Sequence, residues 1–321
     1  MNNLSSSPRR KRSIPPANYR LLLLLVVSAA LIVWLSQVSL PGQRLEGCPD
    51  GCAQESGQDD GLIRILSLNM LHGFPGFEDL DVRVSSIINR IKQLDADIVL
   101  LQEVPRGLRS GNVPVQLAEG LSMNYLYYRA NGNRSAILFE EGELILSRLP
   151  LRNGGFYELR PAAGAFEHRT VLHAEVDSPG GSLKVFVTHL TSGDPVINRQ
   201  QTESLLDYVK TSSNLPKIIA GDFNASESSP QIMTLAQEWV DAYRLFNPDD
   251  QGFTCCLDDL KSEPAEPFEK RIDYIFLAGS EQAELTLLDA QRVFDQPERT
   301  SNGWQWASDH AGVMVTIQSG R

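Results

Sequence analysis

Positive charge is scarce in this sequence once the first twenty residues are set aside. The chain of 321 residues has 29 lysine and arginine side chains against 40 aspartate and glutamate side chains. Five of the basic residues, Arg9–Arg12 and Arg20, lie in residues 1–20, which contain no acid. Residues 21–321 therefore hold 24 basic and 40 acidic side chains, a net charge of −16. Because non-specific nucleic-acid affinity comes mostly from cationic side chains, this balance disfavours a nucleic-acid partner.

Cysteine is also scarce, and the sequence has no internal repeat of the period that marks a solenoid. Cys48 and Cys52 form one pair along the chain, and Cys255 and Cys256 form another. The segment around the first pair has no histidine, and the spacings do not match those of zinc ligands, so a zinc site is not expected. An oxidising compartment would permit disulfides, whose connectivity the sequence leaves open.

An uncharged apolar run fills residues 21–40. At about 1.5 Å per residue, 20 helical residues would span about 30 Å, the thickness of a hydrocarbon core. The run predicts a transmembrane helix, and the basic residues Arg9–Arg12 predict that residues 1–20 stay in the cytoplasm. A cleaved signal peptide or a lipoprotein signal ending at Cys48 is the alternative, and all three place the following domain outside the cytosol. Residues 41–61, rich in small and polar residues, are expected to form a flexible tether.

The remaining residues, 62–321, have the hydrophobic patterns of one domain in which strands and helices alternate. Strands are expected at 62–69, 97–103, 136–139, 144–147, 182–190, 217–224, 271–277 and 311–317. Helices are expected at 81–94, 198–211 and 230–240, and long loops at 152–169, 246–270 and 291–308. This order predicts an α/β (α+β) fold of two packed sheets with helices outside.

Polar residues follow several of the apolar runs. Asp222 and Asn224 are two residues apart, so an extended backbone points both side chains to the same face. A carboxylate beside an amide suits the handling of a water molecule and a phosphoryl oxygen, although the same residues are also common in turns. Asp273 lies inside an apolar run, where a buried carboxylate requires a partner such as a histidine.

These strand ends occur in an ordered series of short motifs: LSLN (66–69), LLQEV (100–104), ILSRLP (145–150), THL (188–190), GDFN (221–224), RIDYIF (271–276) and SDH (308–310). In this order they resemble the endonuclease/exonuclease/phosphatase superfamily, which includes deoxyribonuclease I, exonuclease III, neutral sphingomyelinases and inositol polyphosphate phosphatases. The resemblance covers residues 63–317. It implies a four-layered α/β sandwich, with two packed mixed sheets flanked by helices and a site where the strand ends of both sheets meet.

The resemblance also implies a metal site. Glu103 would be the main ligand of Mg²⁺, for which Mn²⁺ could substitute, and Asn69 and Asp309 would assist it. Asp309 could instead serve His310 or a second metal. A hard cation with few carboxylate ligands leaves room for water and phosphate oxygens and acts on the phosphoryl group as a Lewis acid.

Catalytic roles follow in the same way. Asp222 would orient and deprotonate the attacking water, and Asn224 and His189 would donate hydrogen bonds to the phosphoryl oxygens. Asp273 would fix His310, whose imidazolium would stabilise the charge of the transition state. No catalytic position is substituted, which argues against an inactive protein.

The substrate is less well specified. His189 in its THL motif is similar to the deoxyribonuclease and sphingomyelinase branches, and the motifs of the inositol phosphatases are missing. Trp304 and Trp306 could rest at a bilayer interface or stack on a substrate. Arg160 and Arg169 could bind a second phosphate group of the substrate.

The sequence therefore predicts a membrane-anchored, Mg²⁺-dependent phosphodiesterase with its catalytic domain outside the cytosol. Its expected substrate is a phospholipid or sphingolipid head group or another small phosphodiester. The alternatives are an extracytoplasmic nuclease, and a phosphomonoesterase or inactive binding module. The leaving group, the number of metals and the oligomeric state stay open.

Overall fold

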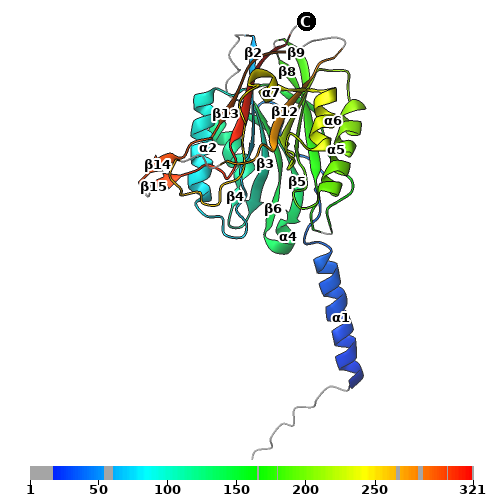
Figure 1. Cartoon of the computed structure of the whole chain (residues 1–321). Helices are drawn as coiled ribbons and strands as arrows, with labels where there is room; N and C mark the ends of the chain where they lie inside the picture. Colours follow the sequence, from blue (N-terminus) through cyan, green and yellow to red (C-terminus); the bar gives the residue numbers. More distant parts are fainter. Residues whose placement is uncertain are drawn as a thin grey trace, which may run out of the picture.

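The structure is a computed structural model that describes residues 17–53, 61–164, 166–178, 180–264, 268–280, 285–301 and 303–319. The basic residues Arg9–Arg12, expected to lie in the cytoplasm, are outside the described residues. The described chain forms two large mixed sheets and a small two-stranded hairpin, with helices on the outer faces (Figure 1).

The first sheet has eight strands, and its order is β1-β5-β6-β3-β2-β16-β13, with β4 paired to β3. Their bounds are Glu46–Cys48 (β1), Leu62–Asn69 (β2), Ile98–Gly107 (β3), Gly111–Asn112 (β4), Asn124–Asn133 (β5), Phe139–Ser147 (β6), Leu285–Val293 (β13) and Gly312–Ser319 (β16). The second sheet has six strands in the order β11-β12-β10-β9-β8-β7. These are Leu151–Glu158 (β7), Thr170–Ser178 (β8), Gly181–His189 (β9), Lys217–Asp222 (β10), Val240–Asp241 (β11) and Asp273–Ala278 (β12). The hairpin pairs Glu298–Thr300 (β14) with Gly303–Gln305 (β15).

Helices cover the outer face of each sheet, and the result is four layers (Figure 1). The helices α2 (Leu80–Leu94) and α3 (Val113–Leu121) pack on the first sheet, and α5 (Pro195–Lys210) and α6 (Pro230–Glu238) pack on the second. The shorter α4 (Arg134–Ile137) precedes β6, and α7 (Ala242–Phe246) precedes β12. The expected α/β sandwich with two packed sheets is therefore confirmed.

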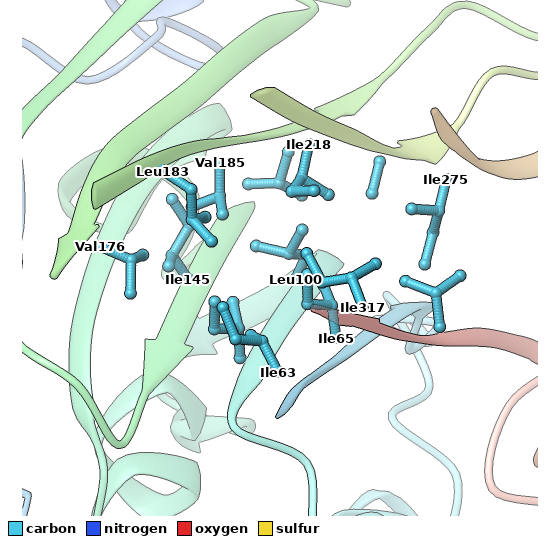
Figure 2. Packing of buried hydrophobic residues seen from close by; sticks show 14 of the residues in the cluster. Ile63, Ile65, Leu100, Ile145, Val176, Leu183, Val185, Ile218, Ile275 and Ile317 are labelled. Atoms are coloured by element: carbon cyan, nitrogen blue, oxygen red, sulfur yellow. The ribbon is translucent and has the colours of Figure 1, made fainter. Parts of the chain in front are cut away.

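The main core lies between the two sheets. Apolar side chains of the first sheet, such as Ile65 and Leu100, meet those of the second, such as Val185 and Ile218 (Figure 2). Alternate residues of each strand face this layer, and the others face the helices. At about 25 cal/mol per Å² of apolar surface removed from water, these layers supply most of the free energy that favours folding.

Part of the expected secondary structure is wrong around residue 140. Residues 134–137 form the short helix α4, where a strand was expected to begin at 136, and Glu140–Gly142, between the two expected strands 136–139 and 144–147, lie within β6. The buried carboxylate of Glu140 has three cationic neighbours, Arg106, Arg129 and Arg134, within 3.6 Å. Those partners stabilise in a strand a sequence whose local composition favours a turn.

The expected loops at 152–169 and 291–308 are also shorter than predicted. The first of them contains most of β7, and the second contains the hairpin β14–β15. Both additions pair with neighbours in the chain, β7 with β8 and β14 with β15.

The apolar run 21–40 is helical only up to Leu35, in α1 (Ala17–Leu35), and residues 36–39 form a turn and a bend. Within the described part of the chain, no helix combines the length and the apolar composition needed to cross a bilayer. Figure 1 shows α1 projecting from the end of the sandwich where α4 lies. The side chains of residues 21–35 are exposed to solvent all round this helix.

Residues 41–53, expected to belong to a flexible tether, pack against the domain. We call residues 37–48 the strap. Its strand β1 pairs antiparallel with β5, the hydroxyl of Tyr128 donates to the carbonyl of Gly42 at 2.6 Å, and Arg106 pairs with Glu46 at 2.6 Å. Cys48 is disulfide-bonded to Cys52, and Cys255 to Cys256. The rest of the expected tether, residues 54–60, lies outside the described residues.

Candidate active site

Strand register brings three of the expected site residues together in the second sheet. Asp222, the last residue of β10, lies opposite His189 on the parallel strand β9 and opposite Asp273 on the antiparallel strand β12. Gly221 before it approaches β9 so closely that an added Cβ would lie 1.9 Å from the carbonyl oxygen of Thr188. A glycine is therefore required where β10 delivers Asp222 to the edge of the sheet.

The first sheet contributes Asn69 and Glu103. Asn69 ends β2, and Glu103 lies in a bulge of β3, between Leu101 and Val104, with a positive φ of 57°. A bulge re-aims the side chain of a strand residue, and the strain of this backbone conformation is typical of functional sites. The amide of Asn69 donates to Glu103 Oε1 at 3.2 Å and to Asp222 Oδ2 at 3.1 Å. This side chain therefore joins the two sheets at the site.

His310 reaches the site from the loop that precedes β16. Its Nδ1 lies 2.9 Å from Asp273 Oδ2, which also accepts a hydrogen bond of 2.6 Å from the hydroxyl of Thr254. Burial by itself would lower the pKa of His310, but the carboxylates of Asp273 and Asp222 outweigh it and raise the pKa to about 10. The imidazole is therefore positively charged at neutral pH.

Asp222 occupies the centre of the cluster. Its Oδ2 lies 3.5 Å from Nε2 of His189 and 3.8 Å from Nε2 of His310, and its Oδ1 accepts from the backbone N–H of Asn224 at 2.8 Å. Burial and the neighbouring charge of Asp273 raise the pKa of Asp222 to about 7. A carboxyl group with such a pKa is suited to proton transfer near neutrality.

Asn224 and His189 form the wall beside this carboxylate. Asn224, at a positive φ of 49°, points its side-chain amide at Nε2 of His189 (3.1 Å) and at the carbonyl of Leu190 (2.9 Å). Burial and the nearby charge of Arg169 lower the pKa of His189 well below its usual value, so its ring is neutral. A neutral His189 and a charged His310 thus flank the same carboxylate.

Two groups of residues offer ligand atoms for a divalent cation. Asp222, Asp273 and His310 have ligand atoms within 4.8 Å of one another, but the proton that Asp273 holds on His310 would repel a cation there. The alternative is Glu103 with Asp309. Burial raises the pKa of Asp309, and the negative charge of Glu103 raises it further, so a cation would relieve the repulsion between the two carboxylates. This set of hard oxygen donors fits a cation such as Mg²⁺, with the amide of Asn69 adjacent to Glu103.

A pocket of about 510 Å³ opens beside these residues, and Glu103 and His189 form its inner wall. Arg169, expected to contact substrate, lines it and pairs with Glu167 at 2.9 Å. Its other lining residues were not predicted: Val38, Ser39, His72, Phe74, Asn131, Gly132, Ile137, Phe139, Glu141, Phe166 and Glu167. Of these, His72 could have been proposed from the sequence, because it follows the LSLN motif by three residues. A histidine near a metal-binding carboxylate is a common site residue.

Three other expected substrate residues are not brought to this pocket. Trp306 is completely buried, its Nε1 donates to the carbonyl of Ser262 at 3.0 Å, and its ring packs edge-on against Phe268. Trp304 lies in the hairpin β14–β15 under the guanidinium of Arg299. Arg160 is exposed and pairs with Glu158. Trp306 therefore stabilises its own loop and is unavailable to a substrate or a bilayer.

Arg83 is a further residue that sequence reasoning missed. It projects from α2, is completely buried and donates to the carbonyl oxygens of Met70 (2.8 Å), Leu71 (3.0 Å) and Ala307 (3.3 Å). Those carbonyls belong to the loops that follow Asn69 and precede Asp309. A buried arginine thus holds the two halves of the carboxylate site in place.

Replacing Arg83 by methionine, which has a similar length but no donors, is expected to lower the free energy of unfolding by about 3 kcal/mol, because the carbonyl groups that it binds lose their charged partner. Urea denaturation of the full chain would measure it. Arg90→Met, at a partly exposed position of the same helix, is the control. A loss no larger than that of the control would show that these hydrogen bonds contribute little.

The fold and these residues define the class of metal-dependent phosphoesterases and nucleases. The chain belongs to the Endonuclease/Exonuclease/phosphatase family, whose sequence model matches residues 66–310. The family membership expected from the ordered sequence motifs is thereby confirmed.

Solved structures agree with this assignment at the level of the fold. An endonuclease/exonuclease/phosphatase from Beutenbergia cavernae is 24% identical over 81% of this chain and 72% of its own, with a TM-score of 0.61. TDP2 of D. rerio in complex with a single-strand DNA product is 18% identical over 80% of this chain and 99% of its own, with a TM-score of 0.64. A family protein from Leptotrichia buccalis is 18% identical, over 79% of this chain and 99% of its own, with a TM-score of 0.62. No curated protein matches the sequence.

Proposed function

We propose that this protein is a membrane-anchored, Mg²⁺-dependent phosphodiesterase that acts on a phospholipid or sphingolipid head group or a similar small phosphodiester, with its catalytic domain outside the cytosol. The observation that carries the chemistry is the amide of Asn69, which binds Glu103 of one sheet and Asp222 of the other. It holds a metal-type carboxylate and a base-type carboxylate next to each other, beside the pocket that Glu103 lines.

In this mechanism Glu103, Asp309 and Asn69 hold Mg²⁺ or Mn²⁺, which when bound supplies Lewis-acid polarisation of the phosphoryl group. Asp222 orients a water molecule and accepts its proton, for which a pKa of about 7 is well matched. Asn224 and His189 position the phosphoryl oxygens. The imidazolium of His310, held by Asp273, stabilises the negative charge that develops in the transition state. Arg169 in the pocket wall is placed to pair with a further anionic group of the substrate.

Two features support the membrane part of the proposal. The helix α1 exposes leucine and valine side chains all round, and such a surface is stable in contact with lipid. The net charge of −16 on residues 21–321 disfavours a long nucleic-acid substrate. An extracytoplasmic nuclease is the second candidate, because one protein of the same fold was solved with a single-strand DNA product.

A panel assay tests the proposal. The full chain in detergent is offered sphingomyelin, phosphatidylinositol, bis-p-nitrophenyl phosphate and single-stranded DNA, with Mg²⁺ and with a chelator. Hydrolysis of a lipid phosphodiester is expected, falling at least about 100-fold on chelation and in Glu103→Gln, because the charge stabilisation by the metal is lost.

Other results would change the assignment. Hydrolysis of DNA alone would favour the nuclease, and release of phosphate from monoesters alone would favour a phosphomonoesterase. Hydrolysis that ignores both the chelator and Glu103→Gln would reject the site itself, and no hydrolysis with no Mg²⁺ binding would indicate a binding module.

A further inference from the structure

Four large apolar side chains are exposed around the mouth of the pocket. We call Phe74, Leu108, Leu138 and Phe166 the apolar rim, and their exposed fractions are 45%, 76%, 56% and 57%. An exposed leucine is ordinary by itself, but a group of large apolar side chains beside a pocket marks an interaction surface.

The members of the rim come from four segments, three of which are linked by direct contacts, and the fourth lines the same pocket. The backbone N–H of Leu108 donates to the carbonyl of Leu138 at 3.0 Å, and Phe74 stacks on Phe139, the neighbour of Leu138, at 4.4 Å. Phe74 and Phe166 both line the pocket. The rim therefore forms one border of the opening through which a substrate reaches Glu103.

The strap attaches the end of α1 to this same border. The side chain of Asn133, which caps the start of α4, donates to the carbonyl of Gln37 at 2.8 Å, only two residues beyond α1. The hydroxyl of Ser39 donates to the carbonyl of Phe166 at 2.9 Å. Figure 1 shows the result, with α1 leaving the domain next to α4.

The charges near the rim are also suited to a lipid surface. Arg44 in the strap and Arg109 beside Leu108 are exposed, and Arg134 beside Leu138 is 44% exposed. The acidic partner of Arg134, Glu140, is buried, and the half-exposed Glu167 is paired with Arg169. Cations at the border of an apolar surface attract the head groups of an anionic leaflet.

We propose that the apolar rim rests on the bilayer into which α1 inserts, so that the pocket opens directly on the lipid head groups. The proposal depends on the membrane anchoring proposed above and makes it specific. The domain does not swing on a flexible linker, because the strap holds it with one end against the membrane. A phosphodiester near the glycerol or ceramide level then enters the pocket without leaving the bilayer.

Fluorescence quenching tests the contact directly. The full chain carrying Leu108→Trp is reconstituted into vesicles of phosphatidylcholine and phosphatidylglycerol, with and without brominated acyl chains. The fluorescence added by the new tryptophan is expected to fall about twofold with the brominated lipid, as for a side chain at the interface. The matched control is Leu245→Trp, which is 62% exposed on α7, at the other end of the domain from α1 in Figure 1.

Activity provides a second measurement. The double variant Leu108→Ser, Leu138→Asn is expected to hydrolyse the vesicle lipid about fivefold more slowly, because apolar contact with the bilayer is lost, and to hydrolyse soluble bis-p-nitrophenyl phosphate at the parent rate. Asparagine suits the positive φ of 60° at position 138, which protects the fold. Leu245→Ser is the control.

The outcomes separate this proposal from the proposed function. Equal quenching of Leu108→Trp and Leu245→Trp would overturn the rim contact, whatever the enzyme hydrolyses. Selective quenching without lipid hydrolysis would retain the contact and reject the lipid phosphodiesterase. Failure of the full chain to bind vesicles would reject both the anchoring and the rim contact.

Discussion

Asp222→Asn is expected to lower kcat by about 10³-fold, within the range of about 10²–10⁴ that general bases contribute. The substitution keeps the shape of the side chain and one of the two hydrogen bonds that it accepts from Asn69 and Asn224, but an amide cannot accept the proton of the attacking water. With a pKa of about 7, Asp222 is present in both its protonated and its reactive ionised form near neutral pH. Steady-state kinetics with bis-p-nitrophenyl phosphate would measure the change.

The control for this variant is Asp207→Asn, at an exposed position of α5. It removes the same charge from the same protein far from the pocket, and its kcat should equal that of the parent. Folding is checked by the urea midpoint, which removal of a buried carboxyl with a raised pKa should leave unchanged or higher. A variant that stays folded with more than about one tenth of the parent kcat would exclude Asp222 as the base.

Asp273→Asn is expected to lower kcat at pH 8 by about 10²-fold, the cost of one preorganised electrostatic donor. Asp273 is the main group that raises the pKa of His310 to about 10, against the effect of burial. Without that carboxylate, burial lowers the pKa of His310, and the imidazole loses its charge as the pH rises through the new, lower value. The deficit should therefore be larger at pH 8 than at pH 6.

The pH dependence separates this electrostatic role from damage to the structure. In the parent, His310 stays charged up to about pH 10, so its titration should not limit kcat between pH 6 and 8. Thr254→Val removes the other hydrogen bond to Asp273 without removing charge, and it should lower kcat far less. A pH-independent loss in Asp273→Asn would indicate that the carboxylate only supports the fold.

The parts of the fold that were predicted are those whose signal is local. Residues 62–69 alternate between apolar and polar side chains, and residues 218–221 are continuously apolar, so in both stretches the strand conformation follows from the local sequence. The requirement that the buried Asp273 have a partner also follows from local chemistry, and His310 lies 2.9 Å from it. Because parallel and antiparallel pairing aligns strand ends, residues that end strands could be expected to meet.

The features that were missed depend on distant residues. Glu140 is stable in a buried strand only because Arg106 and Arg129 approach from two other strands. The indole N–H of buried Trp306 donates a hydrogen bond to the carbonyl of Ser262, which lies more than forty residues earlier in the chain. The pocket itself is built from seven or more segments, and no local pattern encodes which of them will share a wall. Long-range pairing of this kind overrides local propensity.

The strap also determines where a fragment that contains the catalytic domain can begin. A fragment that begins at residue 61 would lack β1, and the hydrogen-bonding edge of β5 would then be open to a strand of another molecule. It would also lack Val38 and Ser39, which belong to the wall of the pocket. A soluble form that preserves the catalytic chamber should therefore begin near Gln37, just after the helix. Any proteolytic release of the domain would have to leave intact the seventeen residues from Gln37 to Ala53.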